Sequence, residues 1–95
     1  MTHTKAWALI DQVGWCQGQE VKREGDTIVG YCAVGAIYHI YGAQRYDRCL
    51  KKVVARLPYR QSARRYNLLF ALAAWNDAPK RTKAQVVTTL KGANV

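Results

Sequence analysis

Cysteine and histidine are the residues of this chain whose chemistry extends beyond packing. Cys32 follows a β-branched stretch and Gly30, at the start of a segment with helical periodicity. A helix N-terminus lowers the pKa of a thiol and favours the thiolate, the nucleophile of cysteine-dependent enzymes. His39 lies seven residues along the same helix, which is about 10.5 Å of rise and too far for a hydrogen bond. Cys32 is therefore a weak catalytic candidate, and packing explains it better.

The spacing of the cysteines argues against a metal site and against a disulfide framework. Cys16, Cys32 and Cys49 are 16 and 17 residues apart and form no C-x-x-C pair. Together with His3 and His39 they give no pair at the spacing of a zinc knuckle. Secreted frameworks use an even number of cysteines. We expect three reduced, mostly buried thiols, with no metal and no other cofactor.

The clearest signal for recognition is a run of basic residues in a chain whose net charge is +9. Eight basic residues stand against a single acid, Asp47, within residues 45–65. The basic residues are Arg45, Arg48, Lys51, Lys52, Arg56, Arg60, Arg64 and Arg65. Guanidinium groups match the geometry of phosphate, and Tyr46, Tyr59 and Tyr66 lie beside arginines, where exposed rings can stack on bases.

A cationic helix face opposite an apolar arc can also be a solvated surface without a partner. Solvated faces usually mix charges, however, and here Lys52 lies four residues from both Arg48 and Arg56. Like charges at this spacing destabilise a helix by about 0.2–0.5 kcal/mol per pair. Tolerance of that repulsion indicates an anionic partner. An acidic protein surface fits as well as RNA or DNA, and no recognised nucleic-acid module is present.

Upstream of the basic run, the pattern predicts a helix, a hairpin and a second helix. Thr4 can cap a first helix over residues 4–13. The segment 21–29 reads as two short strands around a glycine-containing turn. A second helix is expected at about 32–41, and Gly35 inside it indicates close contact with a neighbouring backbone. Its inward residues, at helical spacing, are Val34, Ile37, Tyr38 and Tyr41.

Downstream, the pattern predicts three more helices. The third, at about 44–57, carries one continuous apolar arc, formed by Tyr46, Cys49, Leu50, Val53, Val54 and Leu57. Pro58 ends it, and a largely apolar fourth helix runs to Trp75. A capping box over 82–85 opens the last helix. The chain is thus expected to be a single α+β domain over 1–95, mainly α, with about five helices and one β-hairpin between helices 1 and 2.

The distribution of apolar residues indicates where in the cell the protein is found. The longest apolar run, within 68–75, is eight residues, whereas a membrane span needs about 18. Insertion of the basic helix into a membrane surface is disfavoured, because its apolar arc is needed for the core. The N-terminal residues are followed by no apolar stretch of the kind found in signal peptides. We therefore expect a cytoplasmic protein that does not bind membranes.

Three short motifs occur in a fixed order. They are Gly14-Trp15-Cys16-Gln17-Gly18, then Cys32-Ala33-Val34-Gly35-Ala36, then Trp75-Asn76-Asp77 with Arg81-Thr82. In this order they resemble a family of small uncharacterised proteins of bacteria, especially actinobacteria, and of their phages. The resemblance is weakest between Tyr41 and Asn67, where the basic run lies. It implies a shared fold and a phage origin, with no activity. The motif residues expected to be structural are Trp15, Cys16, Gly18, Cys32, Gly35, Trp75, Asn76, Asp77, Arg81 and Thr82.

The sequence thus predicts a non-enzymatic binding protein that uses residues 45–65 to engage an anionic macromolecule. Nucleic acid, either RNA or DNA, is the first interpretation, with contacts made mostly through phosphates. The alternative is a phage-type effector that acts in the host cytoplasm and binds an acidic surface of a host protein. A cysteine-dependent enzyme using Cys32 ranks third. The oligomeric state stays open.

Overall fold

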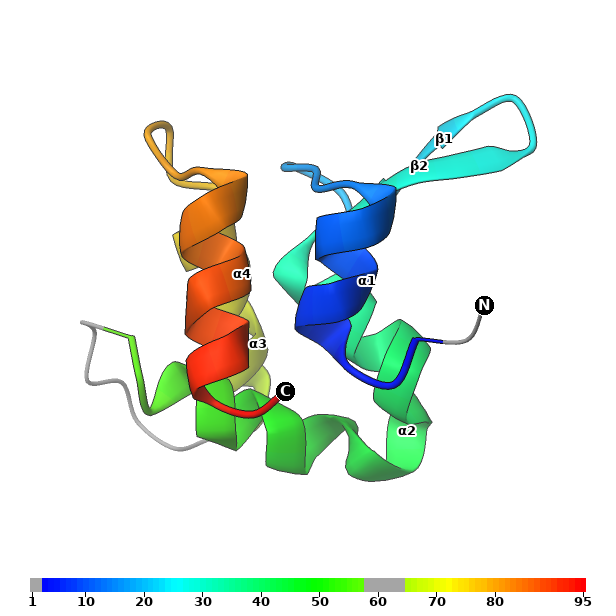
Figure 1. Ribbon diagram of the computed structural model, residues 1–95. Helices are drawn as coiled ribbons and strands as arrows, with labels where there is room; N and C mark the ends of the chain where they lie inside the picture. The colour runs from blue at the N-terminus through cyan, green and yellow to red at the C-terminus, as the bar shows by residue number, and fades with distance from the viewer. Residues whose placement is uncertain (1–2, 58–64) are drawn as a thin grey trace.

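Four helices and one β-hairpin make up the part of the chain that the structure, a computed structural model, describes (Figure 1). This part is residues 3–57 and 65–95, without the side chains of residues 65–67. In chain order the elements are α1 (Ala6–Val13), β1 (Val21–Glu24), β2 (Thr27–Tyr31), α2 (Ala33–Val54), α3 (Arg65–Asn76) and α4 (Lys83–Gly92). The predicted α+β class is confirmed, with the hairpin between the first two helices.

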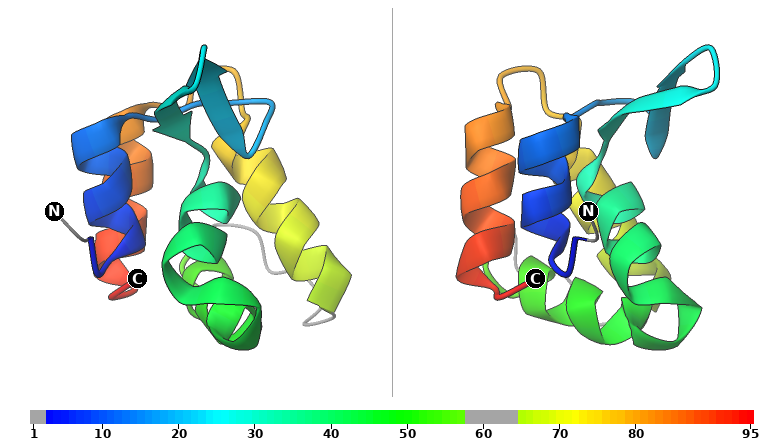
Figure 2. Two further views of the ribbon diagram at one scale, coloured as in Figure 1. Left: turned by 90° about the vertical axis from the view of Figure 1, so that its right-hand side faces the viewer. Right: turned by 45° about the vertical axis from the view of Figure 1, so that its right-hand side comes forward.

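The helix α2 contains the two helices expected at 32–41 and 44–57. They are joined at Gly42, whose φ of 70° and ψ of 179° are not helical. A positive φ strains any residue with a Cβ, so glycine suits this position. The first half of α2 descends beside α1, and the second half crosses the base of the molecule (Figures 1 and 2). Because α2 contacts α1, α3 and α4, it is the platform on which the other helices pack.

The hydrophobic core lies above the second half of α2. The arc predicted from the sequence is confirmed, since Cys49, Leu50, Val53, Val54 and Leu57 are buried and Tyr46 is partly buried. Residues from the other helices complete the core, including Ile10, Leu72, Val86 and Leu90, none of which is measurably exposed. Burial of this arc fixes the rotation of the helix, so its basic side chains must face outward.

The hairpin projects away from the helices (Figures 1 and 2). Its strands are antiparallel, with Val21 opposite Tyr31 and a register shift after Lys22. At its base, Trp15 forms a parallel bridge with Tyr31, which attaches the hairpin to the segment after α1. The predicted close approach at Gly35 is confirmed here, because a Cβ at this position would overlap the carbonyl oxygen of Glu20.

The two predicted N-terminal caps have different outcomes. The capping box of α4 is present: the Gln85 amide donates to Thr82 Oγ1 at 3.2 Å, and the Thr82 amide donates to Gln85 Oε1 at 3.1 Å. The cap predicted at Thr4 is wrong, since α1 begins at Ala6 after Lys5 and lacks a side-chain cap. The Ala6 amide instead donates to the main-chain oxygen of Val95 at 2.6 Å. A long-range contact therefore replaces the local cap.

Tyr41 supports the same contact, because its hydroxyl also donates to the Val95 oxygen, at 2.7 Å. In addition, Lys5 Nζ donates to the main-chain and side-chain oxygens of Asn94, at 3.2 and 3.1 Å. These bonds hold the start of α1 against the segment that follows α4.

Along residues 3–57 and 65–95, no helix combines the length and hydrophobicity that a membrane crossing requires.

Candidate functional site

Five basic side chains of the predicted run are exposed on or just after the second half of α2. We call them the basic face: Arg45, Arg48, Lys51, Lys52 and Arg56. The reverse of the same helix is the buried arc. Two other predicted members, Arg60 and Arg64, lie outside the described residues, and Arg65 is the first residue of α3, without a described side chain. The structure therefore places five of the eight predicted residues on one surface.

The charges of the basic face act on the nearby core. Burial raises the pKa of the Cys49 thiol, while the positive charges of Lys52, Arg45 and Arg48 oppose that shift. Positive charge favours a thiolate, so these side chains act on Cys49 in the direction opposite to burial, although burial outweighs them. A positively charged surface attracts anions.

Arg56 differs from the other members because it also contacts α4. A Cβ placed at Gly92 would lie 2.9 Å from Arg56 Nη2, so the guanidinium lies over the last residue of α4. Cations near a helix C-terminus stabilise it, typically by about 0.3–1 kcal/mol. Arg56 thus has a structural contact of its own, whatever binds the basic face.

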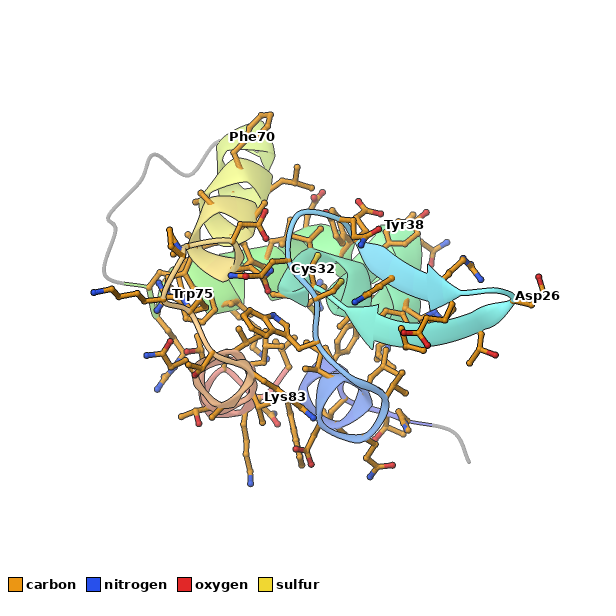
Figure 3. The ribbon with its side chains drawn as sticks, turned by 90° about the horizontal axis from the view of Figure 1, so that it is seen from above. Asp26, Cys32, Tyr38, Phe70, Trp75 and Lys83 are labelled. Atoms are coloured by element: carbon orange, nitrogen blue, oxygen red, sulfur yellow. The ribbon has the colours of Figure 1, made fainter. Side chains whose placement is uncertain are left out.

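The tyrosines that the sequence assigned to stacking are mostly unsuited to it or not described. Tyr46 is partly buried, and its ring packs edge-to-face on Tyr38 at 5.5 Å between centroids. Tyr59 lies outside the described residues, as does the side chain of Tyr66. Tyr38 was expected to face inward, which is wrong: it is 51% exposed, and Figure 3 shows it at the edge of the molecule. An exposed ring near the bend of α2 is thus a feature that periodicity missed.

Cys32 is the N-cap residue of α2, and its sulfur accepts a hydrogen bond from the Gly35 amide at 3.3 Å. The expectation of a lowered pKa is wrong. Burial raises the pKa of the Cys32 thiol to about 11, although amide hydrogen bonds from Gly35 and Val34 oppose the shift. His39 is exposed, and its ring lies 5.3 Å from that of Tyr31. The thiol is therefore protonated near neutral pH, which disfavours it as a nucleophile.

This shift makes folding stability depend on pH. In the unfolded chain the Cys32 thiol ionises near its ordinary pKa of 9.0, and in the folded chain near 11. The raised folded pKa stabilises the protein fully below pH 9, and this stabilisation is lost as the pH rises towards 11. A difference of two pKa units corresponds to about 2–3 kcal/mol. Urea unfolding at several pH values should show the decline. Cys32→Ser should reduce it in part, because burial also raises the pKa of Cys16, Cys49, Tyr41 and Tyr46. An equal decline in the variant would refute the assignment to Cys32.

The three sequence motifs converge on the side chain of Asn76, which has no exposed surface. Its Oδ1 accepts from Trp15 Nε1 at 2.8 Å and from the Ala33 amide at 3.0 Å. Its Nδ2 donates to the Cys16 carbonyl at 3.1 Å and to Asp77 Oδ1 at 2.9 Å. One amide thus joins the end of α3, the start of α2 and the segment after α1. The order of the motifs indicates a shared fold, whereas the hydrogen bonds of Asn76 follow only from the tertiary structure.

Neighbouring motif residues extend the junction. Asp77 Oδ1 accepts from the Gly18 amide at 3.0 Å. Gln17 Nε2 donates to the carbonyls of Asn76 and Ala78 at 3.0 and 2.9 Å. The loop after α3 is therefore held against the loop after α1 by these hydrogen bonds.

In the described residues, no group of three or more His, Cys, Asp or Glu could hold a metal ion.

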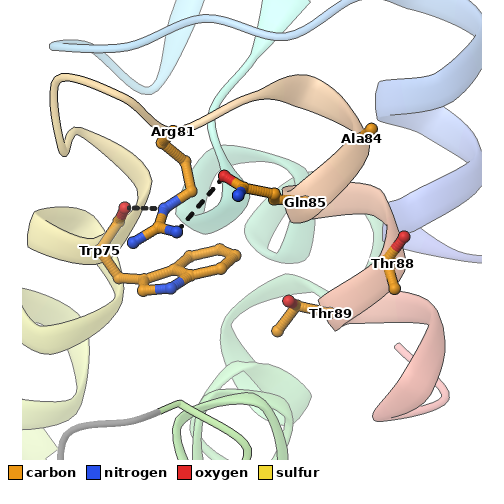
Figure 4. A pocket seen from close by; sticks show the side chains of 6 residues that line it. All are labelled: Trp75, Arg81, Ala84, Gln85, Thr88 and Thr89. Atoms are coloured by element: carbon orange, nitrogen blue, oxygen red, sulfur yellow. Dashed lines mark hydrogen bonds between the residues drawn. The ribbon is translucent and has the colours of Figure 1, made fainter.

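A pocket lies on the other side of the same loop, between the end of α3 and α4 (Figure 4). Arg81 Nε donates to the Trp75 carbonyl at 2.8 Å, and the guanidinium lies 4.2 Å from the centroid of the Trp75 ring. Arg81 Nη1 also donates to Gln85 Oε1 at 3.4 Å. The arginine is thus positioned on an aromatic surface at the wall of the pocket.

Comparison with known proteins gives one match. The model of a family described as "Family of unknown function (DUF6197)" matches residues 2–94. No curated protein and no solved structure matches the chain. The family match therefore covers nearly the whole chain and carries no activity with it.

Proposed function

We propose that this chain, which belongs to the DUF6197 family, is a non-enzymatic protein that binds nucleic acid through its basic face. The family has no assigned activity, so the proposal comes from the surface itself. Following the resemblance of its motifs, we further propose a phage or bacterial origin and a role in the cytoplasm, which is the host's if a phage encodes the chain.

One observation carries the proposal: all five members of the basic face are exposed while the reverse of their helix is buried. Repacking the helix to hide these charges would expose the core. Between Arg45 and Lys52 the helix rises about 10.5 Å, so the face can contact several phosphates of one strand. Arginine can bind a phosphate through two parallel hydrogen bonds. Contacts of this kind carry little sequence preference.

A second candidate partner is an acidic surface of a host protein. The observation that favours it is a pair of exposed aromatic side chains, Tyr38 at 51% and Phe70 at 65% (Figure 3). Protein interfaces are enriched in aromatic residues and arginine. Such a partner would use the basic face in the same way and would leave nucleic acid unbound.

The test is fluorescence anisotropy with labelled single-stranded RNA, single-stranded DNA and duplex DNA over a series of salt concentrations. We expect the logarithm of the binding constant to fall linearly with the logarithm of salt concentration. Each phosphate contact contributes a slope of about −0.9 on duplex DNA and about −0.7 on single strands. A slope equivalent to roughly four or more phosphates supports the proposal. Absence of binding to all three probes at low salt would refute it and favour the protein partner.

A further inference from the structure

The pocket beside Arg81 is an open depression in the surface, large enough to hold a small molecule. Its volume is about 360 Å³, and ligand pockets usually measure about 300–1,000 Å³. Its lining comes from the end of α3, the loop that follows and one side of α4 (Figure 4). The lining residues are Trp75, Arg81, Ala84, Gln85, Thr88 and Thr89. None of these belongs to the basic face.

The guanidinium of Arg81 is fixed at this pocket by neutral groups. Its three described contacts are with the Trp75 carbonyl, the Trp75 ring and the side-chain oxygen of Gln85. The acid nearest in sequence, Asp77, instead accepts hydrogen bonds from Gly18 and Asn76. These contacts orient the positive charge of Arg81 without a counter-charge, which leaves the guanidinium suited to an external anion.

The other lining residues restrict the kind of anion. Among the described residues that line the pocket, Arg81 is the only charged one. The ammonium group of Lys83, at the start of α4, is directed elsewhere, because Nζ donates to the Asp11 carbonyl on α1 at 3.0 Å. One positive charge matches a monoanion better than a dianionic phosphate. Thr88 and Thr89 offer hydroxyls and Ala84 offers apolar surface, while the Trp75 ring, only 4% exposed, lies under the Arg81 guanidinium.

We propose that this pocket binds the carboxylate of a small organic acid. The carboxylate would pair with the guanidinium of Arg81, and its organic part would lie along Ala84 and the threonine side chains. Since the pocket shares no residue with the basic face, this site does not depend on nucleic-acid binding, and each proposal can fail without the other.

The experiment is a titration followed by two-dimensional ¹H–¹⁵N NMR, which resolves the indole N–H of Trp75 and the Nε–H of Arg81. Benzoate is the probe, and benzamide is its neutral counterpart of nearly the same shape. We expect saturable shifts at both signals with benzoate, and binding of benzamide weaker by at least about tenfold, since a charge-assisted hydrogen bond is about twice as strong as a neutral one. Inorganic phosphate at the same ionic strength should bind more weakly than benzoate.

Variants then assign the charge. Arg81→Gln should weaken benzoate binding by at least about tenfold, whereas Lys80→Gln, which removes the same charge from an exposed neighbour, should change it less than twofold. If Arg81→Gln fails to fold, Thr88→Val tests the same pocket, and we expect binding about threefold weaker through loss of one hydroxyl. Equal binding of benzoate and benzamide, tighter binding of phosphate, or an unchanged affinity in both pocket variants would overturn the proposal.

Discussion

Replacement of Asn76 by alanine is expected to lower the free energy of unfolding by about 3–5 kcal/mol, because it leaves several buried polar groups without partners at about 1–3 kcal/mol each. The groups are the Trp15 indole N–H, the Ala33 amide and the Cys16 carbonyl. A domain of this size is stabilised by only about 5–15 kcal/mol in total. The loss is therefore a large share of the total stability, and the variant should unfold at a clearly lower urea concentration than the unchanged chain.

A second variant separates lost hydrogen bonds from lost volume. Asn76→Asp keeps the shape and the acceptor that Trp15 and Ala33 use, but it replaces the donor Nδ2 with an oxygen. That oxygen would face the Cys16 carbonyl and the Asp77 carboxylate. We expect a loss similar to that of alanine at pH 7 and a smaller loss at acidic pH, where a protonated carboxyl donates again.

Urea unfolding followed by tryptophan fluorescence measures both variants. Gln12→Ala, at an exposed position of α1, is the matched control, and its change should stay within about 0.5 kcal/mol. If Asn76→Ala costs less than about 1 kcal/mol, the hydrogen bonds of Asn76 do not hold the three segments together, and the junction is not the structural centre of the fold.

Much of the fold could be predicted because its signals are local. The capping box of α4 needs only residues 82–85, and the buried arc of α2 follows from helical spacing alone. The hairpin is indicated by the turn at Glu24-Gly25-Asp26 and by the β-branched residues that follow it. In each case the residues that decide the structure are close in sequence, so a pattern can reveal them.

The features that sequence reasoning missed depend on distant partners. Thr4 has the right chemistry for a cap, but the amide of Ala6 is already bonded to Val95, which comes from the other end of the described chain. Asn76 joins residues about sixty positions away, and its single side chain gives no periodic signal. The inward orientation expected of Tyr38 was wrong, since Tyr38 is 51% exposed although Val34, one turn earlier, is buried. Helical spacing shows which residues share a side of a helix, and it does not show how far a neighbouring element covers that side.

In the candidate site, too, some features follow from local sequence and others depend on tertiary packing. Exposure of the basic face followed from the position of the apolar arc, whereas the contact of Arg56 with the end of α4 required the tertiary structure. The pKa of Cys32 depends on how deeply it is buried, and burial outweighs the helix terminus that the sequence suggested. Local sequence thus predicted which side of a helix is exposed, and tertiary packing determined the contacts of Arg56 and the pKa of Cys32.

Reversal of three charges on the basic face is expected to weaken nucleic-acid binding by at least about 100-fold, because each lost phosphate contact also becomes a repulsion. The residues are Arg45, Arg48 and Lys52, each changed to Glu. Arg56 is left in place because its guanidinium lies over Gly92. The change at Lys52 creates an opposite-charge pair with Arg56, worth about 0.2–0.5 kcal/mol, which offsets the like-charge repulsion of similar size that remains between positions 48 and 52, so the fold should survive.

The matched control reverses three exposed charges elsewhere, Lys22, Arg23 and Lys80, on the hairpin and the loop before α4. Each triple variant lowers the net charge by six, from +9 to +3, so the two differ only in where the charge is lost. The face variant should also lose about one unit of salt slope per residue, while the control keeps most of its affinity and slope. Equal losses in both would mean that overall charge alone attracts the nucleic acid. A loss confined to the first variant would assign binding to the face of α2, which the core forces outward.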